Sequence, residues 1–175
     1  RVVIGEGHES LYRAATSGLA LAPFVVGADT RKGSVYNGLC SYKDDDLDDF
    51  VLIHDAARPF VSAASIHNLL DAMTTSNAAT LACPMADTLV TDGYKMLDRN
   101  TIHGVQTPQA FRIGALKSAH EKFGRDNSFT DDAGLMAAMG EKVTLVPSPR
   151  DNFKITTNED FIMAEKLLAS QTQTR

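Results

Sequence analysis

Short apolar segments rich in β-branched residues alternate along this chain with segments of helical periodicity, and this alternation restricts the fold more than any other feature. It is typical of an α/β domain in which helices cover both faces of a mainly parallel sheet. We therefore predict a three-layer α/β fold. Strands are expected at residues 2–4, 24–26, 50–54, 80–84 and 142–146, with helices between them.

The helices are predicted from apolar residues that recur at helical spacing after polar start signals. Such patterns follow Glu9 and Ser62, occupy residues 116–123, and run over 135–139 before Gly140, a predicted C-terminal cap. The last helix has the spacing of a capping box in Thr156 and Glu159. Its buried stripe is predicted to consist of Phe161, Ala164, Leu167 and Leu168.

Length and composition favour one soluble domain over residues 1–175. The chain is 43% apolar, and its 17 basic and 22 acidic side chains give a net charge of -5. A general basic surface for nucleic acid is therefore not expected. Cys40 and Cys83 are too few for a disulfide framework, and no apolar run is long enough to span a bilayer. These features predict a cytoplasmic protein with no nucleic-acid or membrane partner.

Two stretches interrupt the alternation. Residues 87–111 contain β-prone pieces around a turn at Asp92-Gly93, which predicts a hairpin arm that projects from the domain and can reach a second subunit. Residues 43–49 contain five aspartates, but they lack the glycine and the distal glutamate of a calcium loop. A solvated turn is the preferred interpretation of that stretch.

The segment Val51–Pro59 predicts a site. An apolar run, read as a buried strand, ends in Asp55, two alanines, Arg58 and a proline. In open α/β sheets, ligands bind at the carboxyl ends of the strands, so these two charged residues would lie where chemistry usually occurs. The alternative is an ordinary strand-to-helix loop in which Asp55 caps the helix and Arg58 forms a surface salt bridge.

Six segments, taken in order and spacing, resemble one enzyme family over nearly the whole chain. The chain resembles the 2-C-methyl-D-erythritol 4-phosphate cytidylyltransferases, and near Gly7–Tyr12 it also resembles bifunctional versions with a cyclodiphosphate synthase domain downstream. The segments are Gly27–Leu39, His54–Pro59, Asp98–Asn100, Gln106–Phe111, Phe129–Ala133 and Asp151–Thr156. The resemblance implies a Rossmann-like nucleotidyltransferase fold.

The resemblance also implies a reaction. In the family, a phosphate oxygen of methylerythritol phosphate attacks the α-phosphorus of CTP, and pyrophosphate leaves. Two polyanions must approach each other, which requires Mg²⁺ or another divalent cation and several cationic side chains. By resemblance, Asp55 binds the metal, Asp151 is a second metal or water partner, Arg58 contacts the substrate phosphate, and Lys154 lies near the substrate and leaving groups. Lys154 could instead pair with Asp151 or Asp160.

Further site residues are implied by the same resemblance. Ala28, Asp29 and Ser34 match nucleotide-binding positions, although many relatives carry glycine where Ala28 stands, and Ser34 is equally a candidate helix N-cap. The family is a homodimer with shared active sites, in which Thr88 and Arg99 would enter the partner's substrate site. Arg99 beside Asp98 is also explained by an ion pair within a turn. Thr130 and Thr107 match polar positions of the substrate site, although Thr130 beside Asp131 is equally a candidate helix cap.

One expected element does not occur in this sequence. Relatives begin with a strand and a glycine-rich loop that holds the triphosphate, and no such segment precedes Arg1. We expect it upstream of this numbering; the alternative is a truncated chain. Two other functions stay open, namely a different alditol-phosphate cytidylyltransferase, such as one for ribitol phosphate, and a non-catalytic dimerising module.

Overall fold

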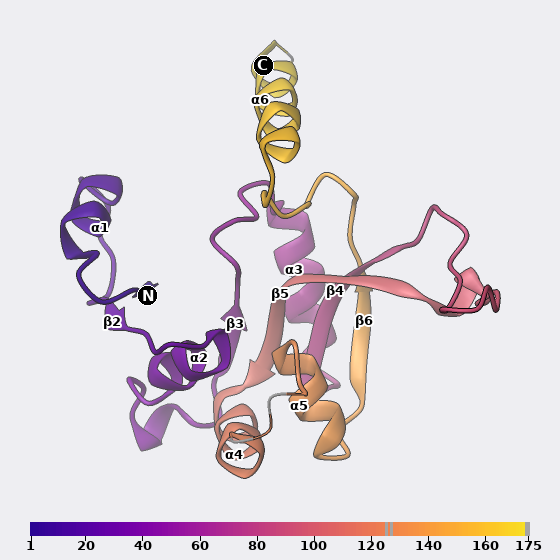
Figure 1. Ribbon diagram of the computed structural model, residues 1–175. Coiled ribbons are helices and arrows are strands. Elements are labelled where there is room, and N and C mark those ends of the chain that lie inside the picture. Colours follow the sequence, from indigo (N-terminus) through magenta and orange to yellow (C-terminus); the bar gives the residue numbers. More distant parts are fainter. Residues whose placement is uncertain (125, 127, 174–175) are drawn as a thin grey trace. The chain divides into compact units, whose positions relative to one another are not determined.

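The protein is described from a computed structural model, which describes residues 1–124, 126 and 128–173. Helices and strands alternate along these residues, and the α/β class predicted from the sequence is confirmed (Figure 1). The strands form a two-stranded sheet, in the order β1-β2, and a four-stranded sheet, in the order β3-β5-β4-β6. The chain divides into two compact units, each described by itself below: unit 1 holds residues 1–51, 76–78 and 110–143, and unit 2 the remainder.

Unit 1 begins with the smaller sheet. The strands β1 (Val3–Ile4) and β2 (Val25–Val26) are parallel, and Val3 pairs with Val25. Between them lies α1 (Glu9–Ala15), as predicted. The helix α2 (Arg31–Leu39) follows β2, where a helix between the strands was expected, but its start was not located because Gly33, Gly38 and its polar residues obscure the apolar period. Its N-cap is Thr30, whose hydroxyl accepts a hydrogen bond from the backbone N–H of Gly33.

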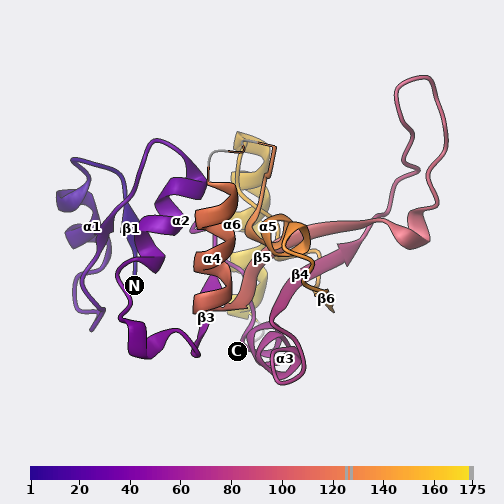
Figure 2. The same cartoon turned by 90° about the horizontal axis from the view of Figure 1, so that it is seen from below.

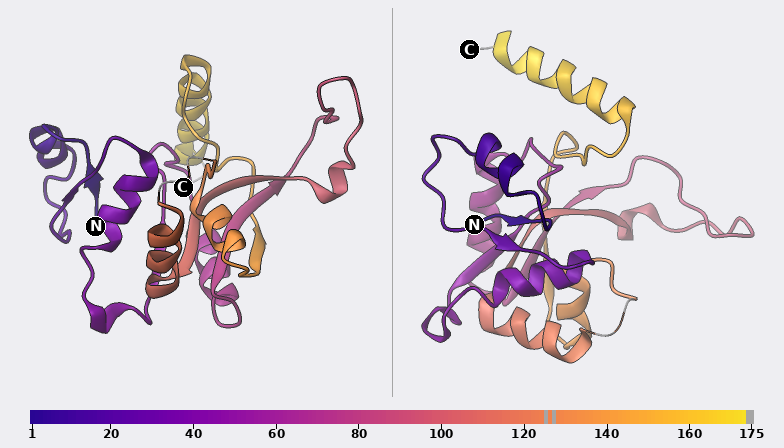
Figure 3. Two further views of the ribbon diagram at one scale, coloured as in Figure 1. Left: turned by 60° about the horizontal axis from the view of Figure 1, so that its bottom comes forward. Right: turned by 60° about the vertical axis from the view of Figure 1, so that its left-hand side comes forward.

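Two further helices complete unit 1. These are α4 (Ile113–Phe123) and α5 (Asp132–Ala138), which contact each other, and α4 also contacts α2 (Figure 3). The predicted glycine cap of α5 is confirmed, since Gly140 has a φ of 89° and the backbone N–H groups of Gly140 and Glu141 bond back to the last turn. The aspartate-rich stretch contains a 3-10 helix, Asp44–Asp46.

A buried ionic cluster joins three helices of unit 1, α2, α4 and α5. Asp132 on α5 is 1% exposed, and its carboxylate lies 2.9 Å from His120 Nε2 on α4 and 2.8 Å from Arg31 Nη1 on α2. Burial raises the pKa of Asp132, but the hydrogen bond from His120 and the charge of Arg31 together outweigh burial and hold this pKa below its usual value. The ionised carboxylate is therefore the form that the fold stabilises.

Unit 2 contains the remaining helices and most of the larger sheet. Its helix α3 (Ala63–Ala72) begins at Ser62, which accepts a hydrogen bond from Ser65 N as the start signal predicted, and it buries Leu69 with the following Met73. The strands are β3 (Phe50–Ile53), β4 (Ala78–Pro84), β5 (His103–Arg112) and β6 (Val143–Pro147). The sequence did not predict β5, the longest strand, because Gln106, Thr107, Pro108 and Gln109 make it read as a loop.

The segment between β4 and β5 extends away from the ends of these two strands (Figure 2). The predicted turn at Asp92-Gly93 is confirmed, because Gly93 and Tyr94 both have positive φ and Val90 forms an antiparallel bridge with Met96. The 3-10 helix Arg99–Thr101 precedes β5. Residues 103–111, predicted as part of the arm, belong to the sheet strand β5.

The C-terminal helix α6 (Asn158–Gln173) is present, but its details correct the prediction. The capping pair is shifted by one residue, since Thr157 Oγ1 accepts from Asp160 N and the Asp160 carboxylate accepts from the backbone N–H groups of Thr156 and Thr157. Of the predicted buried stripe, Ala164 is buried, whereas Phe161 and Leu168 are 57% and 59% exposed. None of the helices among the described residues is long and apolar enough to cross a membrane.

We predict that Asp132→Asn lowers the free energy of unfolding by about 3 kcal/mol at pH 7, because it removes the anion from a buried pair. The pKa of Asp132 is depressed in the folded state, so its contribution is present above the unfolded pKa and is lost as pH falls through the folded pKa. Urea unfolding at pH 7 and below about pH 4 should therefore show a difference between wild type and variant that shrinks at low pH. Asp71→Asn, at an exposed position on α3, is the matched control and should change stability by less than about 0.5 kcal/mol.

Candidate functional site

The end of β3 delivers Asp55 into a hydrogen-bonded turn in unit 2. The backbone N–H of Asp55 donates to Thr107 Oγ1 at 3.0 Å, and His54 Nδ1 lies 3.1 Å from the same hydroxyl. His54 Nε2 lies 3.0 Å from the carbonyl oxygen of Arg58, which can only accept. In the neutral ring, Nε2 therefore carries the proton and Nδ1 accepts from Thr107. Thr107 is buried in β5 and fixes the turn.

The carboxylate of Asp55 pairs with Lys154 across a long sequence separation. Lys154 Nζ donates to Asp55 Oδ2 at 3.0 Å, and the two side chains are 42% and 18% exposed. The alternative partners of Lys154 are not used, because Asp160 caps α6 and Asp151 is exposed without a hydrogen bond or ion pair among the described residues. Asp55 does not cap a helix either, since Ser62 caps α3.

Arg58 is half-buried and is held by a backbone acceptor. Its Nη1 donates to the carbonyl oxygen of Asn152 at 2.9 Å, while its Nε is buried with no hydrogen-bond partner among the described residues. Burial lowers the pKa of Arg58, and the negative charge of Asp55 opposes this shift. Arg58 is therefore oriented by the fold and not by a surface salt bridge.

Asn152 fixes the loop that carries Asp151 and Lys154. Its side chain is 1% exposed, and its amide Nδ2 donates to Gln106 Oε1 at 3.0 Å and to the carbonyl oxygen of Thr107 at 2.9 Å. The backbone N–H of Ile155 also donates to Ala57 O at 2.9 Å, which ties the same loop to the turn after β3. The loop after β6 is thus anchored to β5 and to the Asp55 turn.

A cavity of about 400 Å³ opens beside these residues in unit 2. Its lining includes the cations Arg58, Arg150 and Lys154, the carboxylate of Asp87 and the thiol of Cys83. Gln106 Nε2 lies 3.5 Å from Cys83 Sγ. Cationic side chains around a concave site of this size suit a small anionic ligand.

The two predicted residues of the arm lie outside this cluster. Thr88 and Arg99 are exposed, and Arg99 Nη1 makes a long hydrogen bond of 3.4 Å to Ala86 O. The Asp98 carboxylate accepts from Asn100 N instead of pairing with Arg99. Within the subunit, Arg99 is therefore not explained by an ion pair in the turn.

The predicted nucleotide residues lie in unit 1. Ser34 does not cap α2: its hydroxyl accepts from Ala28 N at 3.0 Å and donates to Ala28 O at 3.1 Å, which fixes the loop that also contains Asp29. The side chain of Ala28 is closely approached, because a Cβ at Gly33 would lie 2.8 Å from the Ala28 Cβ. Glycine is required on both sides of this contact, since a Cβ at Gly27 would lie 2.6 Å from Ser34 Oγ.

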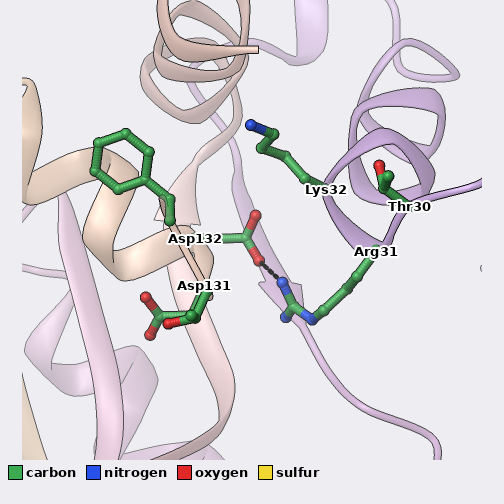
Figure 4. A pocket seen from close by; sticks show the side chains of 7 residues that line it. Thr30, Arg31, Lys32, Asp131 and Asp132 are labelled. Carbon is green, nitrogen blue, oxygen red and sulfur yellow. Dashed lines mark hydrogen bonds and ion pairs between the residues drawn. The ribbon is translucent and has the colours of Figure 1, made fainter. Parts of the chain in front are cut away.

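Thr130 lines a second cavity, of about 270 Å³, which lies within unit 1. Lys32 and Arg31 of α2 line it too, and Figure 4 shows the Arg31 guanidinium reaching the Asp132 carboxylate. Asp131, not Thr130, is the N-cap of α5, because its side chain accepts from Gly134 N. Thr130 therefore lines the cavity without capping the helix.

Sequence reasoning missed four residues that build the site in unit 2: His54, Cys83, Arg150 and Asn152. Two of them stand inside the segments that carried the resemblance, but neither their burial nor their partners can be read from those segments. No group of three or more His, Cys, Asp or Glu side chains positioned for a metal occurs in the described part of the chain.

Comparison with known proteins identifies the family. The family model for 2-C-methyl-D-erythritol 4-phosphate cytidylyltransferase (IspD) matches residues 2–170. The chain belongs to this family. It is 45% identical over 148 residues to the 2-C-methyl-D-erythritol 4-phosphate cytidylyltransferase of Deinococcus radiodurans, covering 82% of this chain and 62% of that protein. It is 41% identical over 177 residues to the bifunctional enzyme IspD/IspF of Rhizorhabdus wittichii, covering 99% of this chain and 45% of that protein.

Solved structures of family members have the same fold. The 4-diphosphocytidyl-2C-methyl-D-erythritol synthase of Anaerococcus prevotii superimposes with a TM-score of 0.86 at 29% identity, covering 95% of this chain and 80% of that one. The cytidylyltransferase of Thermus thermophilus gives 0.74 at 36% identity, covering 86% and 77%. The predicted nucleotidyltransferase fold is thereby confirmed. The chain spans 45% and 65% of the length of the first two curated relatives that it matches.

We predict that Asn152→Asp destabilises the protein by about 3 kcal/mol, because a buried carboxylate would face the carbonyl oxygen of Thr107 with no donor in place of Nδ2. Urea unfolding at pH 7 measures the loss. Asn68→Asp, which makes the same change at an exposed position on α3, is the control and should be near neutral. Equal stability of the two variants would show that the Asn152 anchor does not hold the loop.

Proposed function

We propose that the protein transfers CMP from CTP to 2-C-methyl-D-erythritol 4-phosphate, which gives 4-diphosphocytidyl-2-C-methyl-D-erythritol and pyrophosphate in non-mevalonate isoprenoid biosynthesis. The observation that carries this proposal is the meeting of Asp55, Arg58 and Lys154 beside one cavity in a member of the cytidylyltransferase family. The two free thiols, Cys40 and Cys83, suit a reducing cytoplasm, in which we place the enzyme.

The chemistry explains why cations surround the cavity. A phosphate oxygen of the sugar phosphate forms a bond to the α-phosphorus of CTP, and the bond from that phosphorus to the bridging oxygen of the β-phosphate breaks. Negative charge on both substrates opposes their approach, so the site must neutralise charge and position the reacting atoms. We assign Arg58 to the sugar phosphate and Lys154 to the reacting phosphates. Thr107 accepts a hydrogen bond from the backbone of Asp55 and so fixes the turn that carries this carboxylate.

Asp55 fits the role of a Mg²⁺ ligand. Its carboxylate is partly exposed beside the cavity residue Lys154, and Mg²⁺ in nucleotide sites takes one or two carboxylates while substrate phosphates and waters complete its shell. The ion would supply positive charge to the phosphates, and Asp55 would hold it. Asp151, exposed on the anchored loop, is assigned as a second partner of the metal or of its water.

We assign the nucleotide to residues of unit 1 and the arm to a partner subunit. Ala28 and Asp29 lie in a loop, and Ser34 Oγ of α2 hydrogen-bonds to both the backbone N–H and the carbonyl oxygen of Ala28; these three residues are assigned to the nucleotide. Thr130 is assigned to the sugar-phosphate substrate. The protein is proposed to be a homodimer with shared active sites. Support comes from Thr88 and Arg99, which are exposed on an arm that extends from β4 and β5.

Pyrophosphate release from CTP tests the function directly. With magnesium, the protein should release pyrophosphate in the presence of methylerythritol phosphate and not with ribitol phosphate at the same concentration. Release with ribitol phosphate alone would assign a different alditol-phosphate cytidylyltransferase. Silence with both substrates, on folded protein, would leave the non-catalytic dimerising module.

Asp55→Asn should abolish magnesium-dependent turnover, with a loss of at least about a hundredfold in kcat, because it removes the metal-binding charge. The substituted asparagine keeps the shape of the side chain, so urea unfolding should change little beyond the loss of a partly exposed ion pair, about 1 kcal/mol. A titration of the rate against magnesium measures the effect. An undiminished rate at low magnesium would exclude Asp55 as the metal ligand.

Mixed dimers test the shared site. Arg99→Ala and Asp55→Asn should each be inactive alone, whereas a mixture of the two subunits should regain up to about a quarter of the wild-type rate, since half of the dimers are mixed and one site in each is intact. Rate measurement after subunit exchange checks this. If native mass spectrometry shows that subunits have exchanged but the rate does not recover, Arg99 does not act in the partner's site.

A further inference from the structure

The cavity of unit 2 contains one cation that the family resemblance does not assign. Arg58 and Lys154 have roles in the proposed function, and both lie close to the negative charge of Asp55. Arg150 lines the same cavity from the loop after β6. The positive charge of Arg150 adds to those of Arg58 and Lys154 around the cavity, where the proposed function places a phosphate.

The backbone around Arg150 is fixed on both sides. Ser148 is buried and its N–H donates to Ala82 O at 2.9 Å, and Asn152 is anchored through its buried side chain to β5. The exposed side chain of Arg150 thus projects from a held loop and not from a free one. A residue on such a loop reaches the cavity without the ordering cost that a mobile loop would incur.

The contacts of Arg150 leave its guanidinium available. Its hydrogen bond in the described part of the chain is from Nη2 to Pro84 O, at 3.4 Å, which is long for such a bond. No ion pair joins it to Asp87 or Asp151 among the described residues, although Asp87 lines the same cavity. A guanidinium has five N–H donors in a planar fork, so most of them can turn to a ligand.

Among the residues that line the cavity, Arg150 is the other guanidinium beside Arg58. One of its terminal nitrogens is occupied by Asn152 O, and its Nε is enclosed by protein. A phosphate monoester carries close to two negative charges and three acceptor oxygens at neutral pH, more than the remaining donors of one half-buried arginine can satisfy. Lys154 contributes a point charge that is shared with Asp55.

We propose that Arg150 is a second phosphate-binding guanidinium of the cavity, which together with Arg58 holds the phosphate monoester of the sugar substrate. This inference rests on the proposed function for the identity of the sugar phosphate. Arg150 then determines the affinity for the sugar phosphate and not the affinity for CTP. The chemical step itself does not require it.

The test combines equilibrium binding with steady-state kinetics on the full chain. Titration calorimetry with inorganic phosphate and with methylerythritol phosphate should show binding about tenfold weaker for Arg150→Ala than for wild type, and Arg150→Lys should lie between them. In turnover, Arg150→Ala should raise the KM for methylerythritol phosphate about tenfold, with the KM for CTP and kcat within about twofold. Arg13→Ala, which removes an exposed arginine on α1, is the matched control and should match wild type.

The outcomes separate the two proposals. If Arg150→Ala binds phosphate as tightly as wild type and has the same KM for methylerythritol phosphate, Arg150 does not bind the phosphate. Pyrophosphate release by wild type would in that case still support the proposed function. An equal loss in Arg13→Ala would also overturn it, because the effect would then be one of net charge. If wild type releases no pyrophosphate but binds phosphate through Arg150, the proposed function fails and the phosphate site stands.

Discussion

The hydrogen bonds of the Asn152 side chain are the constraint on which the candidate site depends. A side-chain amide that is 1% exposed joins the loop after β6 to Gln106 and Thr107 of β5, and the backbone carbonyl oxygen of the same residue orients Arg58. Thr107 in turn accepts from the backbone of Asp55. One buried side chain therefore sets the relative positions of a cation, a carboxylate and the loop that carries Lys154. The buried amide nitrogen of Asn152 donates to two acceptors, which restricts the position of the loop relative to β5.

The cationic side chains of this site keep positive charge and hydrogen-bond donors for a ligand. Arg58 is oriented by a neutral carbonyl oxygen, Arg150 by a long bond to another, and Asp55 has Lys154 as its partner. Backbone acceptors orient a guanidinium without neutralising it, whereas a carboxylate would do both. Unit 1 uses the opposite arrangement, since the Asp132 carboxylate binds His120 Nε2 and Arg31 Nη1 at once. The cluster around Asp132 therefore stabilises helices, and the cluster around Asp55 can bind anions.

The sequence predicted those parts of the fold and site that depend on local patterns. Strand β3, the start of α3 at Ser62 and the glycine after α5 all have local signals, and they are confirmed. Strand β5 lacks such a signal, because it buries the polar side chains of Gln106, Thr107 and Gln109. Gln106 and Gln109 find their partners in β4, and Thr107 finds its partners in the turn after β3. The capping pair of α6 was misplaced because threonine stands at both 156 and 157 and an acid at both 159 and 160.

The residues of the site differ in whether the resemblance or only the structure identifies them. Asp55 and Lys154 are 99 residues apart, so no local pattern joins them, and the resemblance supplied both. It did not supply Arg150, which stands in none of the matching segments. That residue is recognised only by the cavity that it lines and by the shortage of donors on Arg58. Shared motifs identify the groups that the family's reaction requires, whereas the affinity of one member depends on side chains that only its own packing brings together.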